Sequence, residues 1–232
     1  LPDRKKATVK TFLSSIPQRV RQTIHSVCTD MYEGFVNAAK EVFGKHVKIV
    51  IDRFHVAKLY RSGLDSLRKH ECKRLKQELS EEAYGQFKGA MWALRKSEEQ
   101  LTDDDQDVLS CLFEHSPCLK MAYEFCHEFT SIFDTQLSKR EGKRQMRKWM
   151  HTVRASELRC FDSFVTTLEK YFDDIANYFL DRHTSGFVEG FNNKLKVIKR
   201  RCYGILNVTH LFQRIQLDLY GHSLFAMKII EL

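Results

Sequence analysis

The sequence is poor in residues that interrupt helices, with only ten glycines and three prolines among 232 residues. Both residue types are unfavourable inside helices, so the long stretches between them favour helix. No apolar run approaches the roughly 20 residues that span a bilayer, which argues against a membrane-spanning protein. The charged residues 1–10 also lack the apolar core of a signal peptide. We therefore expect a helix-rich cytoplasmic protein.

The cysteines do not form a recognisable framework. There are seven, an odd number, and no Cys-x-x-Cys pair occurs, so we expect reduced thiols rather than disulfides. One cluster could in principle bind zinc, and it consists of Cys111, His115, Cys118, Cys126 and His127. Its spacings match no common zinc module, so buried apolar cysteines are the simpler interpretation.

Hydrophobic residues make up 43% of the chain and charged residues 29%, which is enough for a real core. The 38 Lys and Arg exceed the 30 Asp and Glu, giving a formal charge of +8. That surplus suits a polyanionic partner, but by itself it favours nucleic acid only modestly. The chain begins without Met and in mid-pattern, so we expect a fragment of a longer protein.

A strand, a helix and a second strand are predicted near the N-terminus. The first strand lies within Thr23 to Thr29, and the helix runs from Met31 to Phe43 and ends at Gly44. The run VKIVI from Val47 to Ile51 is almost unbroken in β-branched residues, which is typical of a strand buried on both faces. Such a βαβ unit predicts two parallel strands.

Helical periodicity then continues almost throughout residues 57–180. Breaks are predicted near residues 102–107, 116–117 and 138–142. The acidic run between Asp103 and Asp107 indicates a solvated helix start rather than a metal site, because acids suit the positive end of a helix dipole. A further helix is expected over about Phe161 to Leu180.

The segment from Ser185 to Arg201 predicts an amphipathic helix, capped by Thr184 or Ser185. One face should be buried, and it carries Val188, Phe191, Leu195, Ile198 and Cys202. A second stripe carries Glu189, Asn193, Lys196 and Arg200, with Lys199 and Arg201 close by.

Glu189 is the only acid between Asp181 and Asp218, within a strongly cationic segment. A surface helix with charge pairs is the ordinary interpretation of such a stripe. The paired asparagines at 192 and 193 are poor helix formers with no evident structural purpose. A carboxylate that holds a cation next to phosphate-binding Lys and Arg accounts for both features.

Three further residues each allow two interpretations. Asp30 can cap the helix that follows it, in a capping box with Glu33, or it can bind a ligand at the carboxyl end of a parallel strand. Asp52 and His55, three residues apart after the second strand, can bind a metal or brace a neighbouring site by hydrogen bonds.

The strings CTDMYEGF, IVIDRFHVAKLYR and SGFVEGFNNKLKVIKRRCYG occur in this order and closely resemble insertion-sequence transposases of the ISL-three type. The resemblance covers essentially the whole chain. It implies an α/β, ribonuclease-H-like core, here partial and with parallel strands, interrupted by a large all-α insertion. It also implies an enzyme that cuts and joins DNA, with an Asp, Asp, Glu triad that holds two Mg²⁺ or Mn²⁺ ions.

Carried over by position, Asp30 resembles the second Asp of the triad and Glu189 the Glu, so both are expected metal ligands and catalytic residues. Asp52 and His55 match an accessory acid-x-x-His motif of related transposases, and a rival assignment makes Asp52 the second Asp. The expected contacts to the DNA backbone are Asn193, Lys196, Lys199, Arg200 and Arg201.

The resemblance implies three segments. Residues 1–60 would be the second part of the core, residues 61–180 the all-α insertion, and residues 181–232 the core-completing helices with the catalytic Glu. The first Asp has no counterpart, because the early candidate Asp3 lies in a charged stretch without a strand, so the chain alone is expected to be inactive.

The expected partners are transposon ends and target DNA, bound by a homodimer or larger assembly in the bacterial nucleoid. The sequence also allows two alternatives. One is a non-catalytic DNA-binding or assembly module derived from a transposase, and the other is a helical regulator or scaffold.

Overall fold

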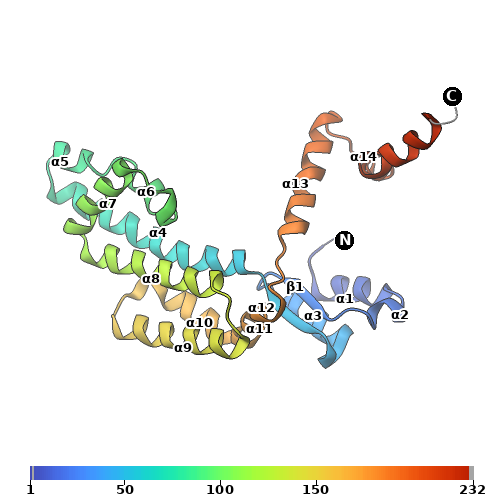
Figure 1. Ribbon diagram of the computed structural model, residues 1–232, viewed down its shortest axis with the longest axis horizontal. Coiled ribbons are helices and arrows are strands. Elements are labelled where there is room, and N and C mark those ends of the chain that lie inside the picture. The colour runs from blue at the N-terminus through green and yellow to red at the C-terminus, as the bar shows by residue number, and fades with distance from the viewer. Residues whose placement is uncertain (2, 230–232) are drawn as a thin grey trace. The chain divides into compact units, whose positions relative to one another are not determined.

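The computed structural model describes residue 1 and residues 3–229, so the last three residues of the predicted segment 181–232 lie outside it. The chain divides into two compact units, Leu1–Thr184 and Ser185–Leu232. It is mostly helical, with one two-stranded parallel sheet (Figure 1). None of the helices described is long and apolar enough to cross a membrane.

The predicted βαβ unit is confirmed. Strands β1 (Ser26–Thr29) and β2 (Lys48–Ile51) pair in parallel, from Ser26 opposite Lys48 to Thr29 opposite Ile51. Helix α3 (Glu33–Phe43) and a 3₁₀ turn (Gly44–His46) join them. Ile49, Val50 and Ile51 are all buried, as their β-branched run predicts. Helices α1 (Lys6–Ser15) and α2 (Gln18–Arg21) precede the sheet, and α1 packs on α3.

A block of helices fills the rest of the larger unit. It comprises α4 (Arg53–Glu78), α5 (Glu81–Gly85), α6 (Ala90–Ala93), α7 (Asp103–His115), α8 (Pro117–Asp134), α9 (Lys139–Ala155), α10 (Asp162–Lys170), α11 (Phe172–Ala176) and α12 (Tyr178–Asp181), with 3₁₀ turns at Glu98–Gln100 and Arg159–Phe161.

The predicted breaks in this block are confirmed. Thr102 caps α7, whose first turn holds the acidic run, and Pro117 is the first residue of α8. Ser138 starts α9 in a capping box with Glu141. The single helix expected over residues 161–180 is wrong, because the chain turns twice there and forms α10, α11 and α12.

Aromatic side chains from α4, α8, α9 and α10 form the centre of the helical block. The Trp149 ring lies 4.6 Å from Phe129 and 5.6 Å from Phe164 between centroids, and Phe129 lies 5.2 Å from Tyr60. The indole nitrogen of Trp149 donates a hydrogen bond of 2.9 Å to the carbonyl of Phe125. These contacts fix the rotation of α9 about its own axis.

Asn177, between α11 and α12, attaches the helical block to the sheet. Its amide nitrogen donates to the carbonyl of Ile49 in β2 at 2.7 Å, and its amide oxygen accepts from Lys139 at 2.6 Å. Tyr171 provides a second link, since its hydroxyl donates to the carbonyl of Met31 at 3.1 Å. These bonds to distant backbone explain why residues 161–180 do not form one straight helix.

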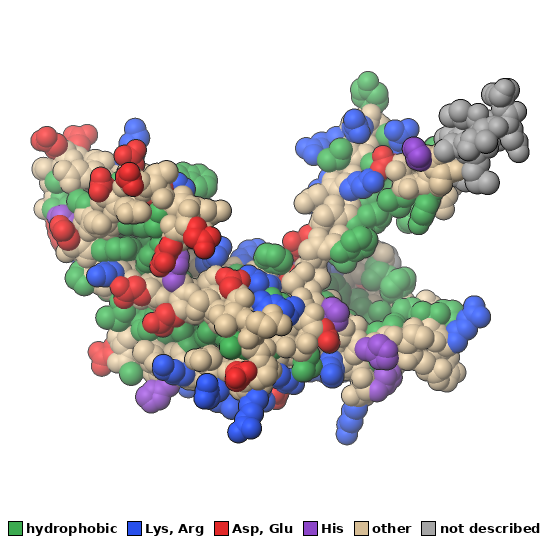
Figure 2. Space-filling view, viewed as in Figure 1, with side chains coloured by type: hydrophobic (Ala, Val, Ile, Leu, Met, Phe, Trp, Pro, Cys, Tyr) green, Lys and Arg blue, Asp and Glu red, His purple; other side chains and the backbone are tan. Residues whose placement is uncertain are grey.

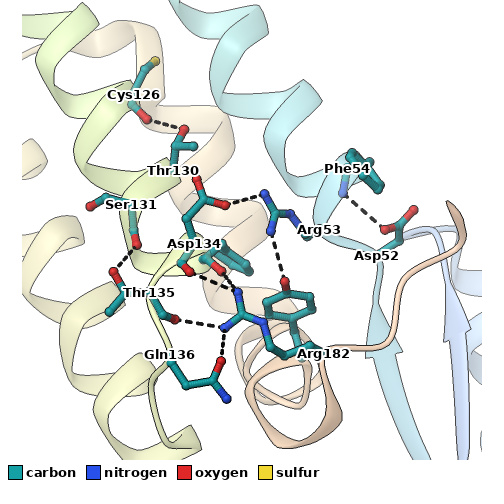
Figure 3. Close-up of polar contacts among 12 residues, drawn as sticks. Asp52, Arg53, Phe54, Cys126, Thr130, Ser131, Asp134, Thr135, Gln136 and Arg182 are labelled. Carbon is teal, nitrogen blue, oxygen red and sulfur yellow. Dashed lines mark hydrogen bonds and ion pairs between the residues drawn. The ribbon is translucent and has the colours of Figure 1, made fainter. Parts of the chain in front are cut away.

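Asp52 connects β2 to α4. Its backbone N–H donates to the carbonyl of Thr29 at 2.9 Å, which continues the sheet pairing one residue beyond β2. Its carboxylate accepts from the N–H of Phe54 at 3.2 Å and so caps the 26-residue helix α4 (Figure 3). The side chain is fully buried.

The smaller unit consists of α13 (Gly186–Arg201) and α14 (Val208–Ile229), joined by a turn in which Tyr203 and Gly204 both have positive φ. Ile198 of α13 and Ile215 of α14 are buried. Lys194 and Asp218 form an ion pair of 2.7 Å between the two helices.

Replacing Asn177 by Ala should lower the free energy of unfolding of the larger unit by about 1–3 kcal/mol, because the buried carbonyl of Ile49 loses its donor. Urea unfolding followed by circular dichroism measures this loss. Asn37→Ala is the matched control, since Asn37 is exposed on α3 and Ala favours helix. Equal stability of the two variants would contradict the role given to Asn177.

Replacing Asp52 by Ala should destabilise the larger unit by about 0.5–2 kcal/mol through loss of the α4 cap. Asp52→Asn should retain most of the stability, because an Asn side chain caps a helix about as well as Asp does. Thermal unfolding of both variants checks the difference. A loss of equal size in both would show that the charge of Asp52, not its capping bond, stabilises the junction.

Candidate active site

Asp30 and Asp52 lie at the same end of the sheet. They directly follow Thr29 and Ile51, the last paired residues of two parallel strands. Neighbouring strands are about 4.8 Å apart, so the two backbone positions are close. Open α/β sheets bind ligands outside the carboxyl ends of their strands, which is where both acids lie.

Asp30 does not cap α3, so the expected capping box with Glu33 is wrong. Helix α3 begins only at Glu33, and its N-cap Tyr32 makes no side-chain cap bond. Glu33 instead pairs with Lys170 of α10, and that hydrogen bond lowers the pKa of the Glu33 carboxyl. One oxygen of Asp30 accepts from the N–H of Tyr32 at 3.1 Å, a local turn that needs no helix.

The other oxygen of Asp30 faces Arg4, at 3.4 Å from the guanidinium. The Asp30 side chain is 26% exposed and that of Arg4 is 68% exposed. Arg4 also lies over the rings of Tyr32 and Phe35, 5.0 and 5.3 Å from their centroids. Asp30 is thus a partly exposed carboxylate at the sheet end, and a largely exposed cation is its ion-pair partner.

His55 lies one turn into α4, beside Asp52. Its Nε2 is 4.0 Å from the second carboxylate oxygen of Asp52, and its side chain is 39% exposed. Burial, and next the charge of Asp52, raise the pKa of the Cys28 thiol to about 11. Cys28 therefore remains a neutral thiol at physiological pH, and oxygen and imidazole ligands dominate this end of the sheet.

Two arginines that the sequence patterns did not single out, Arg53 and Arg182, bond the C-terminal end of α8 (Figure 3). Arg53 donates to the hydroxyl of Tyr178 at 3.1 Å and to the carboxylate of Asp134 at 2.7 Å. It thereby ties the start of α4 to the end of α8 and to α12. The signal available in the sequence was its place beside Asp52 in the string IVIDRFHV.

Arg182 caps the C-terminal end of α8. Its guanidinium donates to the carbonyls of Thr135 at 3.0 Å and Asp134 at 3.3 Å, and also to the carbonyl of Phe133. A cation suits the negative end of a helix dipole, and Arg182 itself adopts a left-handed conformation with φ of 54°. The chain is thus held at the larger unit only four residues before α13 begins.

In the smaller unit, Glu189 is exposed in the first turn of α13. The hydroxyl of Ser185 donates to its carboxylate at 3.3 Å. Ser185 is the N-cap residue of α13, one of the two residues predicted for that position, but its side chain makes no cap hydrogen bond to the backbone.

The two predicted faces of α13 are largely confirmed. Ile198 is buried and Phe191, Leu195 and Cys202 are half-buried, whereas Val188 is 55% exposed and departs from the prediction. The second stripe is exposed along its length, and so are its neighbours: Asn193, Lys196, Lys199, Arg200 and Arg201.

The side chains of the possible zinc cluster have separate partners. The Cys111 thiol donates to the amide oxygen of Gln86 at 3.2 Å, and a ring nitrogen of His115 lies 2.9 Å from the Cys111 carbonyl. His127 packs on the ring of Tyr123, 4.2 Å between centroids, and burial lowers its pKa. Burial raises the pKa of the Cys126 thiol, which favours the protonated form that does not bind metal.

Comparison with known proteins finds relatives that are transposases for insertion sequence elements. The chain is 25% identical over 223 residues to the transposase for insertion sequence element IS1001 of Bordetella parapertussis, covering 96% of this chain and 54% of that protein. It is 24% identical over 136 residues to the transposase for insertion sequence element IS1557 of Mycobacterium tuberculosis, covering 59% of this chain and 30% of that protein.

The chain therefore spans about half the length, or less, of these curated relatives. No solved structure matches it. The family model described as a transposase, of the DDE and ISL-three type, matches residues 1–215. With nearly all of its length matched, the chain belongs to this family of insertion-sequence transposases.

Proposed function

We propose that the chain supplies two of the three catalytic acids of a DNA transposase, Asp30 and Glu189, within a ribonuclease-H-like core. The observation that carries the proposal is Asp30, a partly exposed carboxylate at the carboxyl end of β1 that takes no part in capping α3. The reaction would be two-metal-ion cleavage of a phosphodiester and strand transfer. In this proposal residues 1–60 and 181–232 belong to the core, and residues 61–180 form the all-α insertion.

The residues at the sheet end fit a hard divalent cation. Mg²⁺ and Mn²⁺ favour carboxylate oxygens, which Asp30 provides at the sheet end. Arg4 already balances the charge of Asp30 from an exposed position, so a metal ion can replace it at small cost. When bound, a pair of such ions would stabilise the negative charge that develops on the reacting phosphodiester.

Asp52 and His55 would act as accessory residues. The carboxylate of Asp52 already caps α4, which holds it in one orientation. His55 lies beside its second oxygen, where it can orient a ligand or donate a hydrogen bond. This arrangement favours Asp30 over Asp52 as the second acid of the triad, because Asp30 has no comparable structural role.

The exposed stripe of α13 would hold DNA next to Glu189. Its cations, Lys196, Lys199, Arg200 and Arg201, would contact backbone phosphates, with Asn193 as a neutral donor. Such contacts position a duplex without reading its sequence. The partners in this proposal are transposon ends and target DNA, with a homodimer or larger assembly formed on them.

In a full-length transposase that contains this chain, Glu189→Gln should reduce DNA cleavage to background, because the amide cannot supply the charge of a metal ligand. Binding to transposon ends should remain nearly unchanged. Glu124→Gln is the matched control, since Glu124 is exposed on α8, and it should cleave normally. Cleavage is measured on a labelled donor duplex with Mg²⁺ or Mn²⁺.

Cleavage that survives Glu189→Gln would overturn the assignment of Glu189. A wild-type protein that binds DNA but never cleaves would point to the alternative function, a DNA-binding or assembly module derived from a transposase. In this proposal the chain supplies two of the three acids, so we expect no cleavage from it by itself.

The choice between Asp30 and Asp52 can be tested by Mn²⁺ binding, followed through the electron paramagnetic resonance signal of free Mn²⁺. Asp30→Asn should weaken binding at least about tenfold more than Asp52→Asn, if Asp52 acts on the metal only through its neighbours. Both Asn side chains retain the local hydrogen bond to the backbone, so folding is preserved. The opposite order of affinities would assign the second catalytic position to Asp52.

A further inference from the structure

Helix α9 carries an unusual share of the positive charge. Its 17 residues, Lys139–Ala155, include seven Lys and Arg against one Glu, a net charge of +6. Helix α13 has five against one, a net of +4. Since the whole chain is +8, the remaining residues together are net negative by two charges. The proposed active site uses only one of these two basic helices.

The basic residues of α9 occupy one exposed face. The opposite face is buried and consists of Gly142, Met146, Trp149, Met150 and Val153. The exposed face carries Arg140, Arg144, Arg147, Lys148, His151 and Arg154, and blue side chains gather there in Figure 2. Gly142 brings α9 against the ring of Phe179, where a Cβ would approach within 2.4 Å. The packing thus fixes which side of α9 faces the solvent.

Several acids near this face are already paired. Asp173 binds Lys143 at 2.6 Å and Glu169 binds Arg154 at 2.8 Å. Glu141, the single acid of α9, bonds both the backbone N–H and the hydroxyl of Ser138 in the capping box. The two ion pairs neutralise Lys143 and Arg154 at one edge of the basic face.

The centre of the face is not neutralised. Within residues 3–229, Arg140, Arg144 and Lys148 form no ion pair with any acid. The guanidinium of Arg147 lies 5.0 Å from the centroid of Phe172, which holds it in place without cancelling its charge.

Arg140, Arg144 and Lys148 follow one another at intervals of four residues, so they form a straight row about 12 Å long at 1.5 Å per residue. A DNA duplex carries one negative charge per about 1.7 Å of its axis, so about seven phosphates fall within that length. Arg also binds phosphate through two parallel N–H donors.

We propose that this face of α9 binds the phosphate backbone of duplex DNA, in addition to any contact made by α13. No large hydrophobic side chain of α9 is exposed, whereas the centre of a protein–protein interface is enriched in apolar and aromatic residues. A polyanion therefore fits this face better than a protein surface does. Binding would be independent of base sequence.

The proposal is tested by fluorescence anisotropy with a labelled duplex of arbitrary sequence, over a series of salt concentrations. The variant R140Q/R144Q/K148Q should bind about tenfold or more weakly at 0.1 M salt. It should also reduce the slope of log affinity against log salt by about 3, since each lost phosphate contact contributes about 0.9. The Lys variant R140K/R144K keeps the charge and should bind almost as the wild type does.

The matched control is K73Q/K76Q/K88Q, which removes three exposed cations from elsewhere in the same unit. It should change the slope by less than about 1. Equal losses in the two triple variants, or no loss in the α9 variant, would overturn the proposal.

Acetylation of the wild-type protein provides a second measurement that needs no variant. Bound DNA should protect Lys148 but not Lys73 or Lys88, and unprotected Lys148 would contradict the proposal. Poly-L-glutamate is the competitor that tests for an acidic protein partner, and displacement of DNA at equal charge concentration would assign the face to such a partner instead. None of these readouts depends on Glu189, so a failure of the catalytic assignment and a failure of this proposal are distinguishable.

Discussion

The larger unit depends on how one buried carboxylate, Asp52, joins its sheet to its longest helix. The backbone of Asp52 completes the pairing of β2 with β1, and its side chain starts α4. The direction of α4 is therefore set by the sheet, and α8 and α10 pack on α4 in turn. A buried ionised group is stabilised only when its hydrogen bonds are made, and the positive end of a helix dipole provides a favourable place for it.

This constraint separates the two acids at the sheet end. Asp52 is fully buried and caps α4, its charge contributes to the raised pKa of Cys28, and His55 lies 4.0 Å from its second oxygen. Asp30 follows the neighbouring strand but starts no helix, and its partners are one backbone N–H and an exposed arginine. Two carboxylates at equivalent strand ends thus have different burial and different partners.

The sequence was informative wherever a structure depends on near neighbours. The β-branched run before Asp52 predicted a buried parallel strand, and Thr102, Pro117 and Ser138 marked three helix starts correctly. The capping box expected between Asp30 and Glu33 does not form, because Glu33 binds Lys170 instead. Lys170 lies 137 residues after Glu33 in the chain.

The split of residues 161–180 has the same kind of cause, since Asn177 bonds β2 far back in the chain. Arg53 and Arg182 also act on helices that only the tertiary fold brings to them. The catalytic roles proposed for Asp30 and Glu189 rest on resemblance to a family, although local patterns already allowed each of them to bind a ligand or cation. The basic residues of α9 can be recognised as one face only once Trp149 is seen to be buried on the opposite side of the helix.

The like charges of α9 at four-residue spacing repel one another by about 0.2–0.5 kcal/mol per pair. Helix α9 therefore folds in spite of its charge, and its apolar face offsets the repulsion. A face that costs stability in the free protein is better explained by a polyanion that it binds than by any contribution to the fold.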